Sequence, residues 1–243
     1  MTSLDLGPLA VVSAHSADFV WRAGGAIAAH VARGGQAHVI CLSFGERGES
    51  AKLWRQEGMT LDAVKRARLH EAEEAAAALG AEITFFDAGD YPLPQSHELV
   101  DRLAGALRQL APEAILTHAA YDPYNLDHAD THRLTLQSRM VAQAHGFQPE
   151  DGAVLGAPPV FAFEPHQPEV CEFRPDLLLD ITEVFAQKRK AMECMAAQEH
   201  LWRYYTDLAE RRGVQAVRNS GNRAITHAEA YKRVFPTVAS VLA

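Results

Sequence analysis

The sequence predicts an α/β fold in which a mostly parallel sheet lies between two layers of helices, as in Rossmann-like three-layer sandwiches. Short apolar runs alternate with longer helical patterns along most of the chain. Neither an internal repeat nor a low-complexity stretch interrupts this alternation. The length of 243 residues suits one α/β domain with a full core, so we expect a single domain over residues 1–243.

Apolar runs of four to eight residues predict the strands. Strands that alternate with helices pair in parallel through right-handed crossovers, so their carboxyl ends meet at one edge of the sheet. The predicted strands cover residues 9–14, 37–44, 83–87, 114–117, 159–164 and 177–181.

Alanine-rich and amphipathic stretches between these runs predict the helices. Gly80 is a suitable helix end, and Ser96 is a suitable N-cap for the helix that follows it. The predicted helices cover residues 23–33, 60–79, 99–110, 128–144 and 183–211, with a last short helix near residues 228–233.

Composition and charge exclude several classes of protein. The formal net charge of −8 argues against a nucleic-acid partner, which usually requires a basic face. Cys41, Cys171 and Cys194 are widely spaced and form no CxxC pair, so they predict reduced thiols and neither a disulfide framework nor a thiolate zinc site. The first apolar run is too short for a signal segment or a membrane span, and we expect a cytoplasmic protein.

Polar side chains that commonly bind metals follow two of the predicted strands. His15 and Asp18 come directly after the first strand, and the segment 122–132 (DPYNLDHADTH) follows a later one. Ligands of open α/β sheets bind outside the carboxyl ends of strands, and hydrolytic zinc sites take three His, Asp or Glu ligands. We therefore predict one metal site with His128 as the third ligand. His132, one helical turn further on, is either another ligand or a supporting residue.

These segments resemble the motifs of the LmbE/PIG-L family of zinc-dependent N-deacetylases. Residues 14–18 (AHSAD) are similar to the family's Ala-His-Pro-Asp-Asp, and residues 125–128 (NLDH) to its His-x-Asp-His. Residues 45–48 (GERG) and 68–71 (RLHE) resemble its Gly-Glu-x-Gly loop and its Arg-x-x-Glu helix. The resemblance covers most of the chain and implies the family's α/β fold with Zn²⁺ bound by His15, Asp18 and His128.

Two positions depart from the family pattern. The family's general base is replaced by Ala17, and its oxyanion-stabilising histidine by Asn125. Amide hydrolysis needs both groups, so their joint replacement implies different chemistry. Residues 162–168 and 218–221 are similar to a branch of the family that adds water to an unsaturated oxo-tricarboxylate during the breakdown of aromatic acids.

Hydration of a conjugated double bond requires a base for the incoming water and an acid for the neighbouring carbon. Since Ala17 cannot accept a proton, Glu46 is the first candidate for the base and Glu49 the second. His166, which follows the strand predicted at 159–164, is the candidate acid because imidazole titrates in the useful range.

A small tricarboxylate substrate requires positively charged and hydrogen-bonding side chains. Guanidinium groups bind carboxylates through paired hydrogen bonds. Arg22, near the start of the first helix, is expected at the surface. The candidate binding residues are Arg47, Arg68 and Arg218, with Tyr124, Asn125 and Asn219 as neutral donors.

Two other functions stay open. One is a zinc N-deacetylase whose base has moved, for example to Glu46, and the other is a binding module that keeps the metal without turnover. Ala17 and Asn125 argue against the first, and polar residues at five strand ends argue against the second. The family resemblance also implies a homo-oligomer, with Trp202 and Tyr204 of a long C-terminal helix as candidate contacts.

Overall fold

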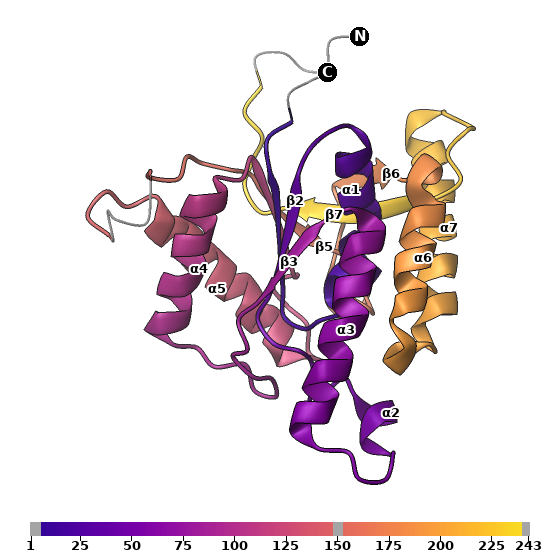
Figure 1. Ribbon diagram of the computed structural model, residues 1–243. Coiled ribbons are helices and arrows are strands. Elements are labelled where there is room, and N and C mark those ends of the chain that lie inside the picture. Colours follow the sequence, from indigo (N-terminus) through magenta and orange to yellow (C-terminus); the bar gives the residue numbers. More distant parts are fainter. Residues whose placement is uncertain (1–5, 148–152, 240–243) are drawn as a thin grey trace.

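The computed structural model describes residues 6–147 and 153–239, and these form one seven-stranded sheet with helices on both faces (Figure 1). The strand order is β3-β2-β1-β4-β5-β7-β6. The strands are β1 (Leu9–Ser13), β2 (Ala37–Cys41), β3 (Glu82–Phe85), β4 (Ala114–Thr117), β5 (Val160–Phe163), β6 (Leu177–Asp180) and β7 (Ala228–Arg233).

The pairing confirms the predicted α/β class. Strands β1 to β5 pair in parallel, and β7 is antiparallel to its neighbours β5 and β6. The chain extends the sheet from β1 through β2 to β3, and then returns to add β4 and β5 on the other side of β1. The gap between β1 and β4 is therefore the switch point where ligands bind in folds of this type.

Helices form a layer on each side of the sheet. Figure 1 shows α4 and α5 on one side and α1, α3, α6 and α7 on the other. None of the helices in the described part of the chain has the length and apolar composition needed to cross a bilayer. The helices are α1 (Asp18–Ala32), α2 (Ala51–Trp54), α3 (Leu61–Leu79), α4 (His97–Leu110), α5 (Leu126–Ala142), α6 (Phe185–Cys194) and α7 (Leu201–Ser220).

Two predicted helix ends are confirmed by their local geometry. The Ser96 side chain accepts a hydrogen bond from the Leu99 amide at 3.2 Å and caps α4. Helix α3 ends at Gly80, whose φ of +75° lies in the left-handed region that favours glycine.

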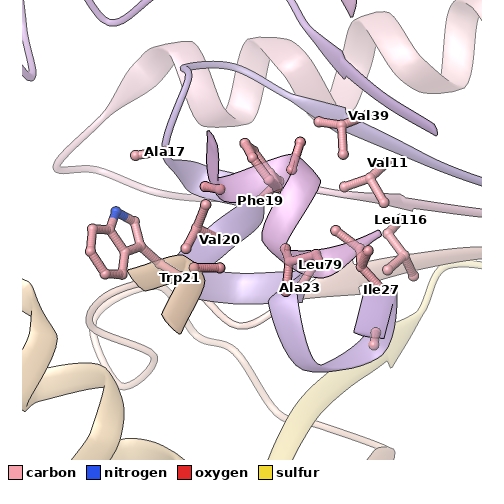
Figure 2. Close-up of a cluster of buried hydrophobic side chains, with 14 of the residues drawn as sticks. Val11, Ala17, Phe19, Val20, Trp21, Ala23, Ile27, Val39, Leu79 and Leu116 are labelled. Carbon is pink, nitrogen blue, oxygen red and sulfur yellow. The ribbon is translucent and has the colours of Figure 1, made fainter. Parts of the chain in front are cut away.

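Helix α1 is almost entirely buried, and this fixes the start of the helix at the switch point. Figure 2 shows Phe19 and Ile27 of α1 near Val11, Val39 and Leu116, which belong to β1, β2 and β4. Burial of a side chain of this size contributes roughly 1.5–3 kcal/mol. The helix begins at Asp18, five residues before the predicted start at 23, so the residues directly after β1 are held as rigidly as the core.

The last predicted helix is wrong, because residues 228–233 form strand β7. The sequence AEAYKR has good helix formers, but its first four residues are buried between β5 and β6. Pairing on both edges outweighs the local preference here. The sequence does not indicate that Glu229 is buried in a strand. Its charge is compensated by Lys188, which lies in a helix distant in the sequence.

The long helix predicted at 183–211 is divided into α6 and α7. The short helix η3 (Ala196–Gln198) lies between them and contains no glycine or proline that would predict a break. Glu71 of α3 accepts a hydrogen bond from the Ala197 amide at 2.8 Å, and Lys52 of α2 donates one to the Ala196 carbonyl at 3.1 Å. Side chains distant in sequence therefore stabilise this break.

A buried ion pair joins α6 to β7, and its carboxylate also binds backbone amides of α1. Glu229 accepts hydrogen bonds from Lys188 at 2.6 Å and from the amides of Gly25 and Ala26 at 2.7 and 2.8 Å. A Cβ atom on Gly25 would lie 2.8 Å from the Glu229 carboxylate, which explains why the helix has glycine at this point. Lys188 also donates to the Trp21 carbonyl at 3.0 Å.

We expect Glu229→Ala to reduce the free energy of unfolding by about 3–5 kcal/mol, because it leaves the Lys188 ammonium buried without its partner. The double variant Lys188→Met/Glu229→Gln should be less destabilised, because it leaves no unpaired buried charge. Urea denaturation measures both. A double variant that loses more stability than Glu229→Ala would show that the charge pair is not the source of the effect.

Candidate active site

Four ionisable side chains converge at the carboxyl ends of the central strands. His15, Asp18, Glu49 and His128 each offer one nitrogen or oxygen atom, and these four atoms lie within 4.8 Å of one another. His15, Asp18 and His128 are buried, whereas the Glu49 side chain is 14% exposed. We call these four residues the ligand cluster.

The local structure on both sides of β1 brings the cluster together. The Asp18 carboxylate accepts a hydrogen bond from the His15 amide at 2.9 Å, which closes the turn between β1 and α1. Glu49 lies in the loop after β2, and His128 lies in the first turn of α5, after β4. The side chain of Asn125 caps that helix by accepting a hydrogen bond from the Asp127 amide at 3.2 Å.

Each histidine of the cluster has a carboxylate on its outer ring nitrogen. His15 Nε2 lies 3.2 Å from Asp127 Oδ2, and His128 Nδ1 lies 2.8 Å from Asp122 Oδ2. Such carboxylates fix the tautomer and orientation of a metal-binding imidazole. Burial opposes ionisation of Asp122, but the hydrogen bond to His128, the charge of Arg22 and the hydrogen bond from the Tyr124 amide contribute together to a lowered pKa of this carboxyl.

The inner ring nitrogens face the two carboxylates of the cluster. His15 Nδ1 lies 3.1 Å from Asp18 Oδ2 and 3.3 Å from Glu49 Oε1. His128 Nε2 lies 3.4 Å from Asp18 Oδ1 and has no hydrogen-bond partner among the described residues, although it is buried. A buried nitrogen that faces carboxylate oxygens without a hydrogen bond fits a metal ligand. Two imidazoles with one or two carboxylates form a donor set that suits zinc and similar divalent ions.

His118, at the end of β4, supports the cluster from behind. Its ring stacks on His128 with centroids 4.2 Å apart, and its Nε2 accepts a hydrogen bond from the Ala14 amide at 3.0 Å. Burial, and after it the neighbouring His128, hold the pKa of His118 well below its ordinary value, so this imidazole is neutral. His132 does not reach the cluster, because its Nδ1 lies 2.8 Å from the His118 carbonyl oxygen.

A pocket of about 210 Å³ opens beside the ligand cluster. A larger groove of about 650 Å³ lies at the β3 edge of the sheet, but no residue of the cluster lines it. Besides Asp18, Glu49 and His128, the walls of the smaller pocket include Arg22, Tyr124, Asn125, His166, Gln198 and Tyr205.

His166 lies in the wall of this pocket, after β5 as predicted. Its ring stacks on that of Tyr204 with centroids 4.2 Å apart. Burial, and after it the charge of Arg22, lower the pKa of His166. The stacking and the adjoining prolines of the segment 165–168 hold the imidazole in place.

Glu46 and Arg47, two residues predicted to act in the site, lie outside the pocket lining. The Glu46 carboxylate accepts a hydrogen bond from the Phe44 amide at 3.1 Å and lies 3.9 Å from Lys65 Nζ, and burial raises its pKa. The Arg47 guanidinium donates to the Asp90 carbonyl oxygen at 3.1 Å. The loop after β2 thus presents Glu49 to the pocket and directs Glu46 toward α3.

The other predicted arginines do not line the pocket either. Arg68 is buried and donates to Glu71 at 2.6 Å and to the Gln198 side-chain oxygen at 2.9 Å, so it orients a wall residue without reaching the pocket itself. Arg218 and Asn219 are exposed at the end of α7. Arg22, expected at the surface, is only 7% exposed and lines the pocket. Its true position follows from the early start of α1.

Comparison with known proteins now identifies the class. Residues 10–138 match the family model of PIG-L, described as GlcNAc-PI de-N-acetylase, and the chain belongs to this family. It is 56% identical over 236 residues to a protein named 4-oxalmesaconate hydratase from Pseudomonas putida KT2440, across 96% of this chain and 91% of that protein.

Solved structures agree with this assignment. The crystal structure of GalB, the 4-carboxy-2-hydroxymuconate hydratase from Pseudomonas putida KT2440, is similar with a TM-score of 0.95 and 55% identity, over 98% of this chain and 100% of that one. The N,N′-diacetylchitobiose deacetylase from Pyrococcus horikoshii has a TM-score of 0.79 at 21% identity, over 95% and 84% of the two chains. This second likeness shows that deacetylases share the fold.

We expect His128→Ala to lose stoichiometric divalent metal, and Asp122→Asn to bind it about 10–100-fold more weakly because His128 is no longer held in position. Elemental analysis and metal titration measure the two effects. His132→Asn is the matched control, since this histidine lies on the same helix outside the cluster, and it should retain metal. Stoichiometric metal in His128→Ala would contradict the assignment of the cluster.

Proposed function

We propose that this protein is a metal-dependent hydro-lyase that hydrates 4-carboxy-2-hydroxymuconate, the enol form of 4-oxalomesaconate. The product is 4-carboxy-4-hydroxy-2-oxoadipate, an intermediate of gallate and protocatechuate breakdown. The observation that carries this proposal is the 56% identity to 4-oxalmesaconate hydratase over 96% of the chain. The arrangement of the pocket supports hydration in preference to amide hydrolysis.

The residues that replace the deacetylase motif lie within the site. Ala17 is fully buried beside Asp18, and its methyl group cannot accept a proton from water. Asn125, at the position of the oxyanion-stabilising histidine, donates to Glu49 at 3.4 Å. A neutral amide that cannot become a cation stabilises an oxyanion less than a protonated imidazole does. The pocket is therefore poorly suited to a tetrahedral amide intermediate.

We propose that His15, Asp18 and His128 hold the metal, which we expect to be zinc, and that Glu49 lies next to it. A divalent ion bound there would lower the pKa of a bound water or polarise a substrate oxygen. The outer carboxylates Asp122 and Asp127 support both imidazoles in this arrangement. The choice of zinc over similar ions, the cytoplasmic location and the homo-oligomer stay predictions.

Glu49 is the better candidate for the base. Its side chain is the most exposed of the ligand cluster, and it lies at the boundary between the cluster and the pocket. Asn125 Nδ2 and His15 Nδ1 lie 3.4 and 3.3 Å from one oxygen of this carboxylate, Oε1. Glu46, the first candidate from the sequence, has its carboxylate on the α3 side of the loop. Which of Glu46 and Glu49 faces the pocket depends on the conformation of an irregular loop, and hydrophobic periodicity in the sequence does not predict that conformation.

His166 is the candidate acid. Hydration replaces the π bond of the substrate with one new C–O bond and one new C–H bond. Glu49 would take a proton from water while the water oxygen bonds to one carbon of the double bond. His166 would give a proton to the neighbouring carbon. Both residues line the same pocket from different strand ends. Transfer of a proton from Glu49 back to His166 then restores both groups, so protons balance over the cycle.

The purified, metal-loaded protein should bleach the ultraviolet absorbance of 4-carboxy-2-hydroxymuconate, because hydration interrupts its conjugation. Glu49→Gln should lower kcat at least 100-fold, as expected for loss of a general base, while Glu46→Gln should remain within several-fold of the unmodified protein. No bleaching at micromolar protein would refute the proposed function. Release of acetate from an N-acetylated amino sugar would instead favour the deacetylase.

The pH profile tests the acid. A general acid must be protonated, so activity should fall as pH rises through the pKa of His166, which burial and the charge of Arg22 lower from its ordinary value. Bound tricarboxylate stabilises the imidazolium, so the alkaline limb of kcat should lie at higher pH than that of kcat/KM. The pH profile of His166→Asn should lack this alkaline decrease in activity, and the variant should retain its metal. An unchanged alkaline limb in this variant would exclude His166 as the acid.

A further inference from the structure

The pocket is lined by carboxylates, which repel a tricarboxylate substrate unless a positively charged group also contacts that substrate. Asp18, Glu49 and Asp122 all contribute carboxylates to the walls. Among the described residues that line the pocket, Arg22 is the only one with a permanent positive charge. The arginines that the sequence suggested for this task lie elsewhere, so the pocket has one guanidinium available for a substrate with several negative charges.

The Arg22 guanidinium is buried but incompletely bonded. Its Nε forms an ion pair with Asp18 Oδ1 at 3.5 Å, which is longer than a normal hydrogen bond, and Nε has no hydrogen-bond partner among the described residues. No hydrogen bond joins its terminal nitrogens to another residue in the described ranges 6–147 and 153–239. Burial of a charged donor that makes no hydrogen bond costs free energy, and a carboxylate that bonds to the guanidinium would reduce that cost.

Hydrogen bonds from β7 and α6 hold the backbone of α1 at Trp21 and Arg22. Tyr231 donates to the Arg22 carbonyl oxygen at 3.3 Å, and Lys188 donates to the Trp21 carbonyl oxygen at 3.0 Å. The Trp21 ring stacks on Tyr205 with centroids 5.4 Å apart, and both residues line the pocket. A guanidinium on a fully packed helix loses little freedom when it binds a ligand, which is the arrangement that favours affinity.

We propose that Arg22 is a substrate-binding residue whose guanidinium takes one carboxylate of the substrate and selects polycarboxylates over monocarboxylates. This inference rests on the proposed function for the identity of the substrate. Arg22 lies one helical turn after Asp18, so the bound carboxylate would lie beside the ligand cluster, with the reacting carbons between Glu49 and His166.

The kinetic test separates binding from chemistry. Arg22→Gln should raise KM for 4-carboxy-2-hydroxymuconate roughly 10- to 150-fold, as loss of a charge-assisted contact does, with a smaller change in kcat. Arg22→Lys keeps the charge but not the paired hydrogen-bond geometry, so its KM should lie between those of the unmodified protein and Arg22→Gln. Arg203→Gln is the control, because this arginine is 92% exposed on α7. An unchanged KM in a folded Arg22→Gln that carries full metal would overturn the proposal.

A binding measurement separates this proposal from the proposed function. Propane-1,2,3-tricarboxylate has no double bond to hydrate, and its affinity for the metal-loaded protein can be measured by calorimetry. The unmodified protein should bind it at least tenfold more tightly than Arg22→Gln does, and butyrate should not distinguish the two. If the protein does not hydrate the substrate but this difference in affinity is observed, the proposed reaction is wrong, whereas the role of Arg22 in binding tricarboxylates is supported. If hydration holds and the difference is absent, Arg22 is not a substrate-binding residue and this proposal is overturned.

Discussion

The crowding of charge at the switch point is the constraint on which the rest of the structure depends. Two carboxylates and two imidazoles have ligand atoms within 4.8 Å of one another, and three of the four residues are buried. Like charges this close in a site of low dielectric repel strongly unless a cation lies between them. The packed start of α1 fixes Asp18 in place, and the outer carboxylates Asp122 and Asp127 orient the two imidazoles beside it. A rigid, almost wholly buried α1 is what makes such an arrangement possible.

Residues in the segments that follow predicted strands could be placed from the sequence. His15, Asp18, His128 and His166 all follow apolar runs, and the topology of a parallel sheet brings such positions to one edge. The outer carboxylates Asp122 and Asp127 were missed, although acidic residues near a metal-binding histidine are the expected signal. That signal becomes specific only when the turn before α5 shows which oxygen meets which nitrogen.

The errors have local physical causes. Placing the start of α1 five residues late turned Arg22 from a wall of the pocket into a surface group. Glu46 and Glu49 are three residues apart in an irregular loop, where Gly45 with φ of +67° sets the direction of the chain and no periodicity applies. Gln198 reaches the pocket only because contacts from α2 and α3 break the helix before it. Strand β7 has helix-forming residues whose burial is decided by neighbours distant in the sequence.

The match to the PIG-L family model ends at residue 138, and this boundary divides the pocket. Every residue of the ligand cluster lies before it, whereas His166, Gln198, Leu201 and Tyr205 lie after it. The matched part of the chain thus contains the whole ligand cluster and one wall of the pocket, and the part after residue 138 contributes the rest of the wall. A change of reaction in this scaffold therefore requires substitutions on both sides of the boundary, because Ala17 and Asn125 lie before it and His166 lies after it.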